Sequence, residues 1–265
     1  MTLNQLLARG RTADVYEWES GRVIKLFHNW LSLENIEYEM KIARAVHASG
    51  VKSPAVFEMV QIDGRHGLIY ERVQGESMLE VFRRQPWNVN RLGGLLAELH
   101  VRMHERVSDT GLPAQRSRLE YKIKNADALP DSVKSSLLGA LQAQPDSDRV
   151  CHGDFHPANI LLEGSDAAII DWVDATRGNP LADVARTTII LLGAAKSSQI
   201  KNPFLKALVA MFHSTYLKHY FRLRPRGMDE YRRWLPIVAG ARLNENIPEL
   251  KTWLVKEAFK VGLMD

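Results

Sequence analysis

The first third of the chain combines strand-like and helix-like patterns of apolar and polar residues. Residues 7–27 alternate around a turn and predict a β-hairpin. Residues 33–49 repeat apolar positions at helical spacing and predict a helix that ends at Gly50. Residues 55–62 and 67–73 predict two further strands. This order predicts a small β-rich unit with a single helix.

The remainder of the chain is mainly helical in pattern. The expected helical stretches are residues 76–85, 88–106, two within 117–145, 184–222 and 228–262. A strand at Val150–Cys151 and two short apolar runs at residues 159–162 and 168–170 interrupt this helical part. The two runs predict the arms of a second hairpin, and we therefore expect an α+β protein.

Composition narrows the class of protein. Apolar residues make up 45% and charged residues 25%, which is ordinary for a globular chain. A net charge of +4 does not require a nucleic-acid partner and does not oppose an anionic nucleotide. The longest apolar stretch, Thr187–Ala195, is about half of a membrane span, and the single cysteine fits a reducing compartment. We expect a cytoplasmic monomer or homodimer with no nucleic-acid or membrane partner.

Residues 151–174 carry the densest set of chemically useful side chains. Asp154 is followed five residues later by Asn159, and Asp171 lies beyond a short apolar run. Carboxylate and amide oxygens are the ligands that Mg²⁺ prefers, and this order of residues is typical of sites for a nucleotide triphosphate and magnesium. The predicted hairpin brings Asn159 and Asp171 to the same end of a two-stranded floor.

The motif H-G-D-x-x-x-x-N, from His152 to Asn159, with I-I-D-W up to Trp172, resembles the aminoglycoside phosphotransferase and choline kinase family. This resemblance implies a two-lobed protein-kinase-like fold. It has a small antiparallel β-rich lobe with one helix, here residues 1–73, and a larger, mostly helical lobe, here residues 74–265. It also implies that the lobes meet at a hinge near residue 73.

The resemblance implies a role for each central residue. Asp154 stands where relatives have the catalytic base, and Asn159 and Asp171 stand where they bind Mg²⁺. Lys25, inside the apolar strand V-I-K-L-F, stands at the place of the lysine that binds the phosphates of ATP or GTP. Glu39 is the expected partner of Lys25, and Glu37 is the alternative. The remaining expected nucleotide contacts are the backbone of Gly10, Arg11 and Thr12 at a phosphate, the backbone of Glu71 and Val73 at the adenine edge, and Leu161 and Ile170 beneath the adenine.

Several polar residues around this set have structural or open roles. The resemblance implies that His152 holds the catalytic loop and that Asp183 braces it. The role of His156 stays open: it either contacts a phosphate or the substrate, or contacts neither. His100 and His104 lie one helical turn apart, a spacing that can bind a metal, but in relatives this helix packs against the catalytic loop. A transition-metal site within residues 151–156 is the weaker alternative for that segment.

We expect a kinase that phosphorylates a hydroxyl of a sugar, aminosugar or amino alcohol. The segment between Asp171 and Asn179 is too short for an activation loop, which favours a small-molecule acceptor over a protein. Two alternatives stay open: a non-catalytic nucleotide-binding pseudokinase and an aminoglycoside-resistance phosphotransferase. Acids and aromatics bind amines, so the candidate acceptor contacts are Tyr231, Trp234, Glu245, Glu249 and Trp253.

Overall fold

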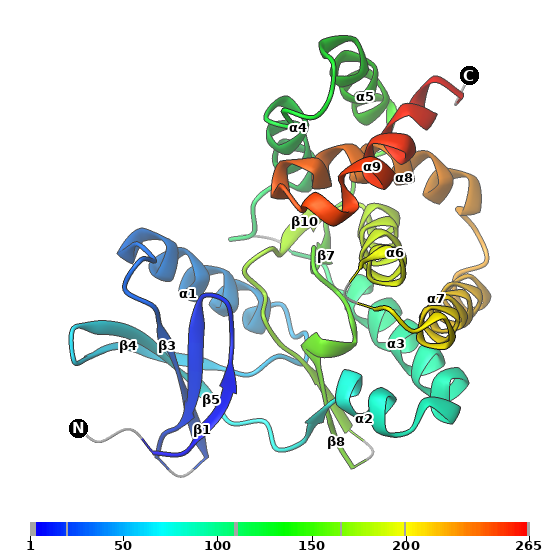
Figure 1. Ribbon diagram of the computed structural model, residues 1–265. Helices are drawn as coiled ribbons and strands as arrows, with labels where there is room; N and C mark the ends of the chain where they lie inside the picture. The colour runs from blue at the N-terminus through cyan, green and yellow to red at the C-terminus, as the bar shows by residue number, and fades with distance from the viewer. Residues whose placement is uncertain (1–3, 20, 109–110, 165, 199, 264–265) are drawn as a thin grey trace.

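A computed structural model of the chain describes residues 4–19, 21–108, 111–164, 166–198 and 200–263 (Figure 1). The protein has two lobes, a smaller one built on an antiparallel sheet and a larger one that is mainly helical. This arrangement confirms the predicted two-lobed α+β architecture.

The small lobe is a five-stranded antiparallel sheet in the order β1-β2-β3-β5-β4. Its strands are β1 (Leu6–Arg9), β2 (Ala13–Glu17), β3 (Arg22–Phe27), β4 (Val56–Ile62) and β5 (Arg65–Glu71). The sequence predicted all of these except β1. That edge strand is exposed along its whole length, so it lacks the alternation that a half-buried strand shows. The predicted turn between β2 and β3 includes Ser20, which lies outside the described residues.

Strand alternation in β3 turns Lys25 toward the single helix of this lobe. Helix α1 (Leu33–Ala48) starts at Ser32, whose side chain accepts a hydrogen bond from the Asn35 amide. Its buried face packs against Phe27 of β3. Ile24 and Leu26, by contrast, belong to a separate cluster. Because successive side chains of a strand point to opposite faces, Lys25 shares the α1 face with Phe27.

The large lobe buries one continuous hydrophobic core, in which α3 packs along α7 and α6 packs against α7 and α8. Its helices are α2 (Met78–Arg84), α3 (Val89–His104), α4 (Gln115–Lys124), α5 (Asp131–Ala143), α6 (Pro180–Lys196), α7 (Pro203–Leu223), α8 (Met228–Arg242) and α9 (Pro248–Ala258), with short 3-10 turns η1 (Pro86–Asn88), η2 (Pro157–Asn159), η3 (Leu243–Glu245) and η4 (Phe259–Leu263). The two predicted stretches at 184–222 and 228–262 are each divided. Proline is favoured at the first position of a helix, and Pro203 and Pro248 each start a new one.

Two small sheets lie at the junction of the lobes. One contains β6 (Glu76–Ser77), β8 (Ile160–Glu163) and β9 (Asp166–Ile169), and the other pairs β7 (Arg149–Cys151) with β10 (Thr176–Gly178). The sequence had assigned β6 to the start of a helix and did not predict β10. The Ile170 amide donates to the Asn159 carbonyl (3.0 Å), so the hairpin of β8 and β9 brings Asn159 beside the residue that precedes Asp171, as predicted.

Within the described ranges, each helix is too short or too polar to cross a lipid bilayer.

Candidate functional site

The loop after β7 depends on a glycine and a histidine. Gly153 has a φ of +78°, and a Cβ added there would lie 2.4 Å from the carbonyl oxygen of Asp174, so only glycine fits. His152 Nδ1 accepts a hydrogen bond from the Asp154 amide (3.1 Å), which leaves the proton on Nε2 to donate to the Ile170 carbonyl (3.0 Å). His152 therefore fixes the loop against the strand that leads to Asp171, which fits its expected structural role.

Asp154 lies at the tip of this loop with its side chain 32% exposed. Its Oδ2 accepts hydrogen bonds from Nε2 of His156 (3.3 Å) and Nδ2 of Asn159 (3.3 Å), and Arg186 Nη2 lies 3.9 Å from Oδ1. Burial acts to raise the pKa of Asp154, but the hydrogen bond and charge of His156 and the charge of Arg186 outweigh it and hold that pKa well below its usual range. Asp154 is thus ionised at neutral pH and partly accessible to solvent.

Lys25 connects the small lobe to Asp171. Its Nζ donates to Glu39 Oε1 (2.7 Å) and to Asp171 Oδ1 (3.2 Å), whereas Glu37 is exposed on the other side of α1. The predicted Lys25–Glu39 pair therefore forms, and Tyr70, which the sequence did not single out, also donates to Glu39 Oε1 (3.2 Å). Burial lowers the pKa of Lys25, but Asp171 and Glu39 raise it above its usual value, so the side chain is a cation.

Asp171 and Asn159 form a donor set that fits magnesium. Asp171 has a φ of +62°, a left-handed conformation that is uncommon outside glycine and that concentrates at active sites. Its side chain is 44% exposed. Asn159 Nδ2 donates to the Asp154 carbonyl (2.9 Å), which leaves its amide oxygen available as a ligand. A carboxylate and an amide oxygen are suitable for a hard cation.

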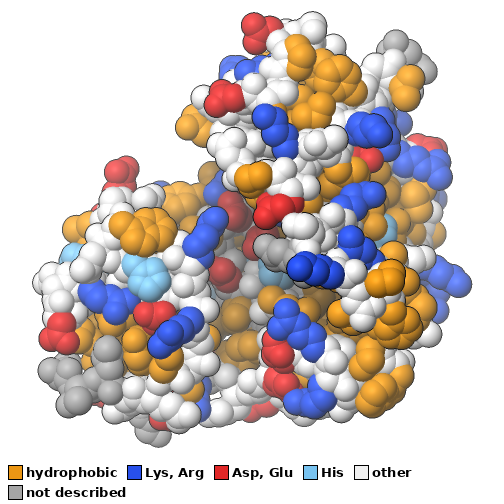
Figure 2. Space-filling model, viewed as in Figure 1, with side chains coloured by type: hydrophobic (Ala, Val, Ile, Leu, Met, Phe, Trp, Pro, Cys, Tyr) orange, Lys and Arg blue, Asp and Glu red, His pale blue; other side chains and the backbone are white. Residues whose placement is uncertain are grey.

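The other residues expected to contact the nucleotide lie on turns and strands of both lobes. Figure 2 shows a hollow between the lobes in which acidic side chains gather. Gly10, Arg11 and Thr12 form the turn between β1 and β2, and the Gly10 amide donates to the Ala13 carbonyl (2.8 Å). The remaining residues are Glu71 at the end of β5, Val73 just after it, half-buried Leu161 on β8 and half-buried Ile170 after β9. The Glu71 amide donates to the Ala55 carbonyl (2.8 Å), which holds the end of β5 against the segment that precedes β4.

Asp183 braces the loop that carries Asp154. It lies in the first turn of α6, which Asn179 caps by accepting the Leu181 amide (2.8 Å). Its carboxylate accepts the backbone amides of His152 (2.7 Å) and Gly153 (2.8 Å). These contacts fit the structural role that the sequence suggested for Asp183.

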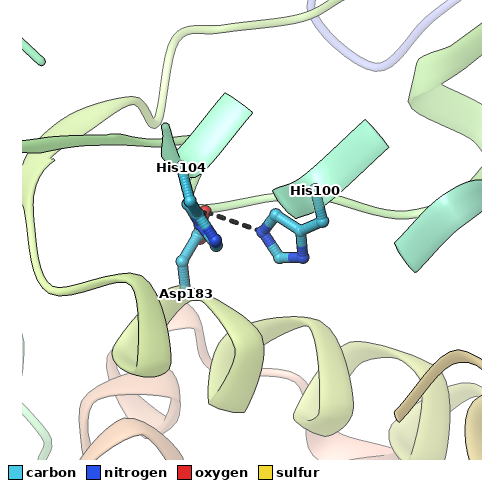
Figure 3. A group of neighbouring side chains, drawn as sticks. All are labelled: His100, His104 and Asp183. Atoms are coloured by element: carbon cyan, nitrogen blue, oxygen red, sulfur yellow. Dashed lines mark hydrogen bonds and ion pairs between the residues drawn. The ribbon is translucent and has the colours of Figure 1, made fainter. Parts of the chain in front are cut away.

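The same carboxylate engages both histidines of α3. Figure 3 shows the imidazoles of His100 and His104 turned toward Asp183 of α6. Their Nε2 atoms donate to Asp183 Oδ2 at 3.1 and 3.3 Å, and their Nδ1 atoms accept from the hydroxyls of Tyr216 (2.6 Å) and Tyr220 (2.9 Å). The three residues have the spacing of a metal site, with ligand atoms within 4.8 Å of one another. Each imidazole nitrogen already has a protein partner, so we interpret the group as a buried hydrogen-bond network.

This network makes the fold sensitive to acid. Burial holds the pKa of His100 at about 3, whereas an imidazole in the unfolded chain titrates near 6.5. Below about pH 6.5 the unfolded state therefore binds a proton that the folded state excludes, and stability falls as pH decreases. We expect the free energy of unfolding to drop by up to about 1.4 kcal/mol per pH unit for this residue. Urea titrations at several pH values between about 5 and 7.5 measure the free energy of unfolding. This free energy should change less steeply with pH in His100→Gln than in the wild type, and an equal pH dependence in both proteins would contradict the assignment.

A cavity opens beside Asp154 between α4 and α8, and we call it the α4–α8 cavity. Gly153 forms part of its wall, and the space measures about 470 Å³ when the part open to solvent is included. Its charged wall residues are Arg118, Lys122, Asp174, Asp183, Arg186, Arg242 and Glu245. Of the candidate acceptor contacts, Glu245 lines this cavity. Tyr231 and Trp234 are core residues, 3% and 1% exposed, while Glu249 is exposed and Trp253 donates to Glu257.

Residues 5–237 match the phosphotransferase enzyme family. No curated protein matches the chain in sequence.

The matching solved structures include a thermostable aminoglycoside phosphotransferase mutant in ternary complex with ADP and hygromycin B, at 15% identity over 98% of this chain and 93% of that one (TM-score 0.64). They also include an amicoumacin kinase in complex with AMP-PNP, Ca²⁺ and its ligand Ami, at 18% identity over 98% and 90% (TM-score 0.60). A choline/ethanolamine kinase family protein from Mesorhizobium loti matches at 17% identity over 96% and 85% (TM-score 0.56). At these identities the likeness establishes the fold, which is protein-kinase-like.

Proposed function

This chain belongs to the phosphotransferase enzyme family, and from that premise we propose that it transfers the γ-phosphate of ATP or GTP to a hydroxyl of a small metabolite. Sugars, aminosugars and amino alcohols are the starting classes of acceptor. One observation supports this most strongly: Lys25 contacts Asp171 across the lobes, while Asn159, beside the end of the same hairpin, hydrogen-bonds to Asp154. A phosphate-binding cation, two magnesium ligands and a proton acceptor are the parts that phosphoryl transfer requires.

The geometry suggests how these residues divide the reaction. Lys25, oriented by Glu39, binds the phosphates, and Asn159 and Asp171 would hold Mg²⁺, which supplies neutralisation of phosphate charge when it is bound. The acceptor oxygen bonds to the γ-phosphorus, the bond from that phosphorus to the bridging oxygen breaks, and the hydroxyl proton passes to Asp154. Asp154 is ionised in the free protein, so it can accept this proton once the hydroxyl is positioned beside it.

The division of the chain near residue 73 belongs to the same proposal. The large sheet ends with β5 at Glu71, and β6 at Glu76–Ser77 already pairs with the catalytic hairpin. Residues 1–73 would then act as the nucleotide lobe and residues 74–265 as the catalytic and acceptor lobe. A cytoplasmic location would give the enzyme its nucleotide, and it suits the buried free thiol of Cys151.

A screen of acceptor alcohols tests the proposal and separates it from the alternatives. We would incubate the protein with Mg²⁺ and either ATP or GTP, and would detect by mass spectrometry both the nucleoside diphosphate and the phosphorylated alcohol. A phosphorylated product establishes the kinase. Nucleotide binding without transfer to any acceptor would favour the pseudokinase. Transfer to aminoglycosides alone, with drug resistance in cells that express the protein, would favour the resistance enzyme.

A further inference from the structure

Arg242 is a buried cation in which two of the three side-chain nitrogens lack a hydrogen-bond partner in the described part of the chain. It is the last residue of α8, and its side chain is 10% exposed in the wall of the α4–α8 cavity. Its Nε and Nη1 are buried and have no hydrogen-bond partner among the residues that the structure describes. The nearest acid is Glu245, whose Oε2 lies 3.7 Å from Nε, too far for a hydrogen bond. A buried charge of this kind is costly, so its position in a cavity beside the reacting groups needs an explanation.

The acids of the cavity are already shared among other cations. Glu245 Oε1 accepts from Arg186 (2.8 Å) and Lys122 (3.4 Å), while Asp174 accepts from Arg118 (2.6 Å). Asp183 also borders the cavity, but its carboxylate is engaged by the loop amides and the α3 histidines described above. Three acids, Asp174, Asp183 and Glu245, therefore face four cations, so the wall of the cavity carries an excess positive charge.

The buried position of Arg242 is also electrostatically unfavourable. Burial, followed by the charge of Arg186, lowers the pKa of Arg242 to about 10. The guanidinium is still charged at neutral pH, and an anion in the cavity would relieve both effects.

We propose that the acceptor carries an oxyanion, either a carboxylate or a phosphate monoester, that binds Arg242 in the α4–α8 cavity while the acceptor hydroxyl meets Asp154. Gly153 lines the cavity and precedes Asp154, and Arg186 contacts both Glu245 and the Asp154 carboxylate, so the two ends of such an acceptor lie within one small space. This inference rests on the proposed function, and it narrows the acceptor to hydroxy acids or phosphorylated alcohols.

The same charges disfavour a polycationic acceptor. Its ammonium groups would compete with Arg186 and Lys122 for Glu245, and with Arg118 for Asp174. They would also approach Arg242, and like charges at close range repel. The charges of this cavity therefore suit an anionic acceptor better than an aminoglycoside.

The test uses four matched three-carbon alcohols and isothermal titration calorimetry in the presence of AMP-PNP and Mg²⁺. The probes are glycerol, glycerate, glycerol phosphate and 3-amino-1,2-propanediol. The protein variants are Arg242→Met, which removes the charge, Arg242→Lys, which keeps it, and Arg233→Met, a matched control at an exposed position of α8. Binding of AMP-PNP is measured first, which reports on the nucleotide site independently.

We expect at least one anionic probe to bind the wild type more tightly than glycerol or the amine. A charge-assisted hydrogen bond predicts a loss of about 10- to 100-fold in affinity in Arg242→Met. Arg242→Lys should retain part of that affinity, and Arg233→Met should retain all of it. Preference for glycerate would identify a hydroxy acid, and preference for glycerol phosphate a phosphorylated alcohol.

Three results would overturn the inference. The anionic probes could bind the wild type no better than glycerol does. The amine could bind the wild type most tightly of the four probes, or Arg242→Met could keep the full affinity for the anionic probes. Stability gives a second readout, because the nearest acid among the described residues lies 3.7 Å from Arg242, and replacing a buried charge that lacks hydrogen bonds on two nitrogens with an apolar side chain should leave the Tm of the free protein unchanged or higher. A clearly lower Tm would instead assign Arg242 to the fold. If AMP-PNP fails to bind while the anion binds, the proposed function fails and the anion site stands.

Discussion

Replacing Asp154 with asparagine is expected to lower kcat for phosphate transfer by about 10²- to 10⁴-fold, the usual contribution of a general base. Asparagine keeps the size of the side chain and one oxygen that can accept the hydrogen bond from His156, but it cannot take the hydroxyl proton. Because Lys25 and Asp171 are untouched, affinity for the nucleotide should change little. Single-turnover transfer from radiolabelled ATP to the acceptor found in the screen measures the rate of phosphate transfer. Calorimetry measures the affinity for the nucleotide.

Asp166→Asn is the matched control for this experiment. Asp166 lies on β9 of the same hairpin, is exposed and pairs with Lys52 at the surface. It should behave like the wild type in both assays. Turnover retained by Asp154→Asn would remove Asp154 as the base.

Replacing Asp183 with alanine should cause a large loss of stability, about 3–5 kcal/mol, because each buried donor left unsatisfied costs about 1–3 kcal/mol and part of that cost is recovered as the side chains rearrange. The side chain is 1% exposed and accepts hydrogen bonds from two loop amides and two imidazoles, and all four donors would be left without it. For a chain of this length the Tm should fall by roughly 10 °C. Differential scanning calorimetry measures this change.

Measuring kcat in Asp183 variants shows whether Asp183 also positions the loop that carries Asp154 or only stabilises the fold. Asp183→Asn keeps one acceptor oxygen, so it should be less destabilising than Asp183→Ala. Both variants should still lower kcat, since they release the backbone that positions Asp154. An alanine variant as stable as the wild type would show that the network contributes nothing to the fold.

The catalytic segment could be predicted because its residues are close in sequence and their spacing is informative. Asn159 follows Asp154 on one loop, and the hairpin that returns to Asp171 is set by two short apolar runs. Lys25 was singled out by the resemblance to the family, because a lysine in an apolar strand alone is usually only its solvent-facing residue. The choice of Glu39 over Glu37 came from the resemblance to the family, and the structure confirms the pairing because Glu39 is buried beside Lys25 and Glu37 is not.

The α4–α8 cavity could not be predicted in the same way. Arg118, Arg186 and Arg242 come from three helices, and a helical pattern shows which side chains are apolar but not which neighbour a polar side chain meets. Tyr231 and Trp234 have the chemistry of an amine site, yet helix packing places them in the core. Strand β1 was missed for a related reason, because an exposed edge strand has no buried face to reveal it.

The central claim is that Asp171 and Lys25 form part of a magnesium-dependent nucleotide site. The most direct test is a thermal-shift titration of the wild type and Asp171→Asn with AMP-PNP, with and without Mg²⁺. Asparagine tolerates the left-handed backbone of position 171, so the variant should fold while losing a charged metal ligand. A ligand that binds only the folded state raises the Tm. The account predicts a magnesium-dependent rise in the wild type that is lost in Asp171→Asn, and an equal rise in both proteins, or none in the wild type, would contradict it.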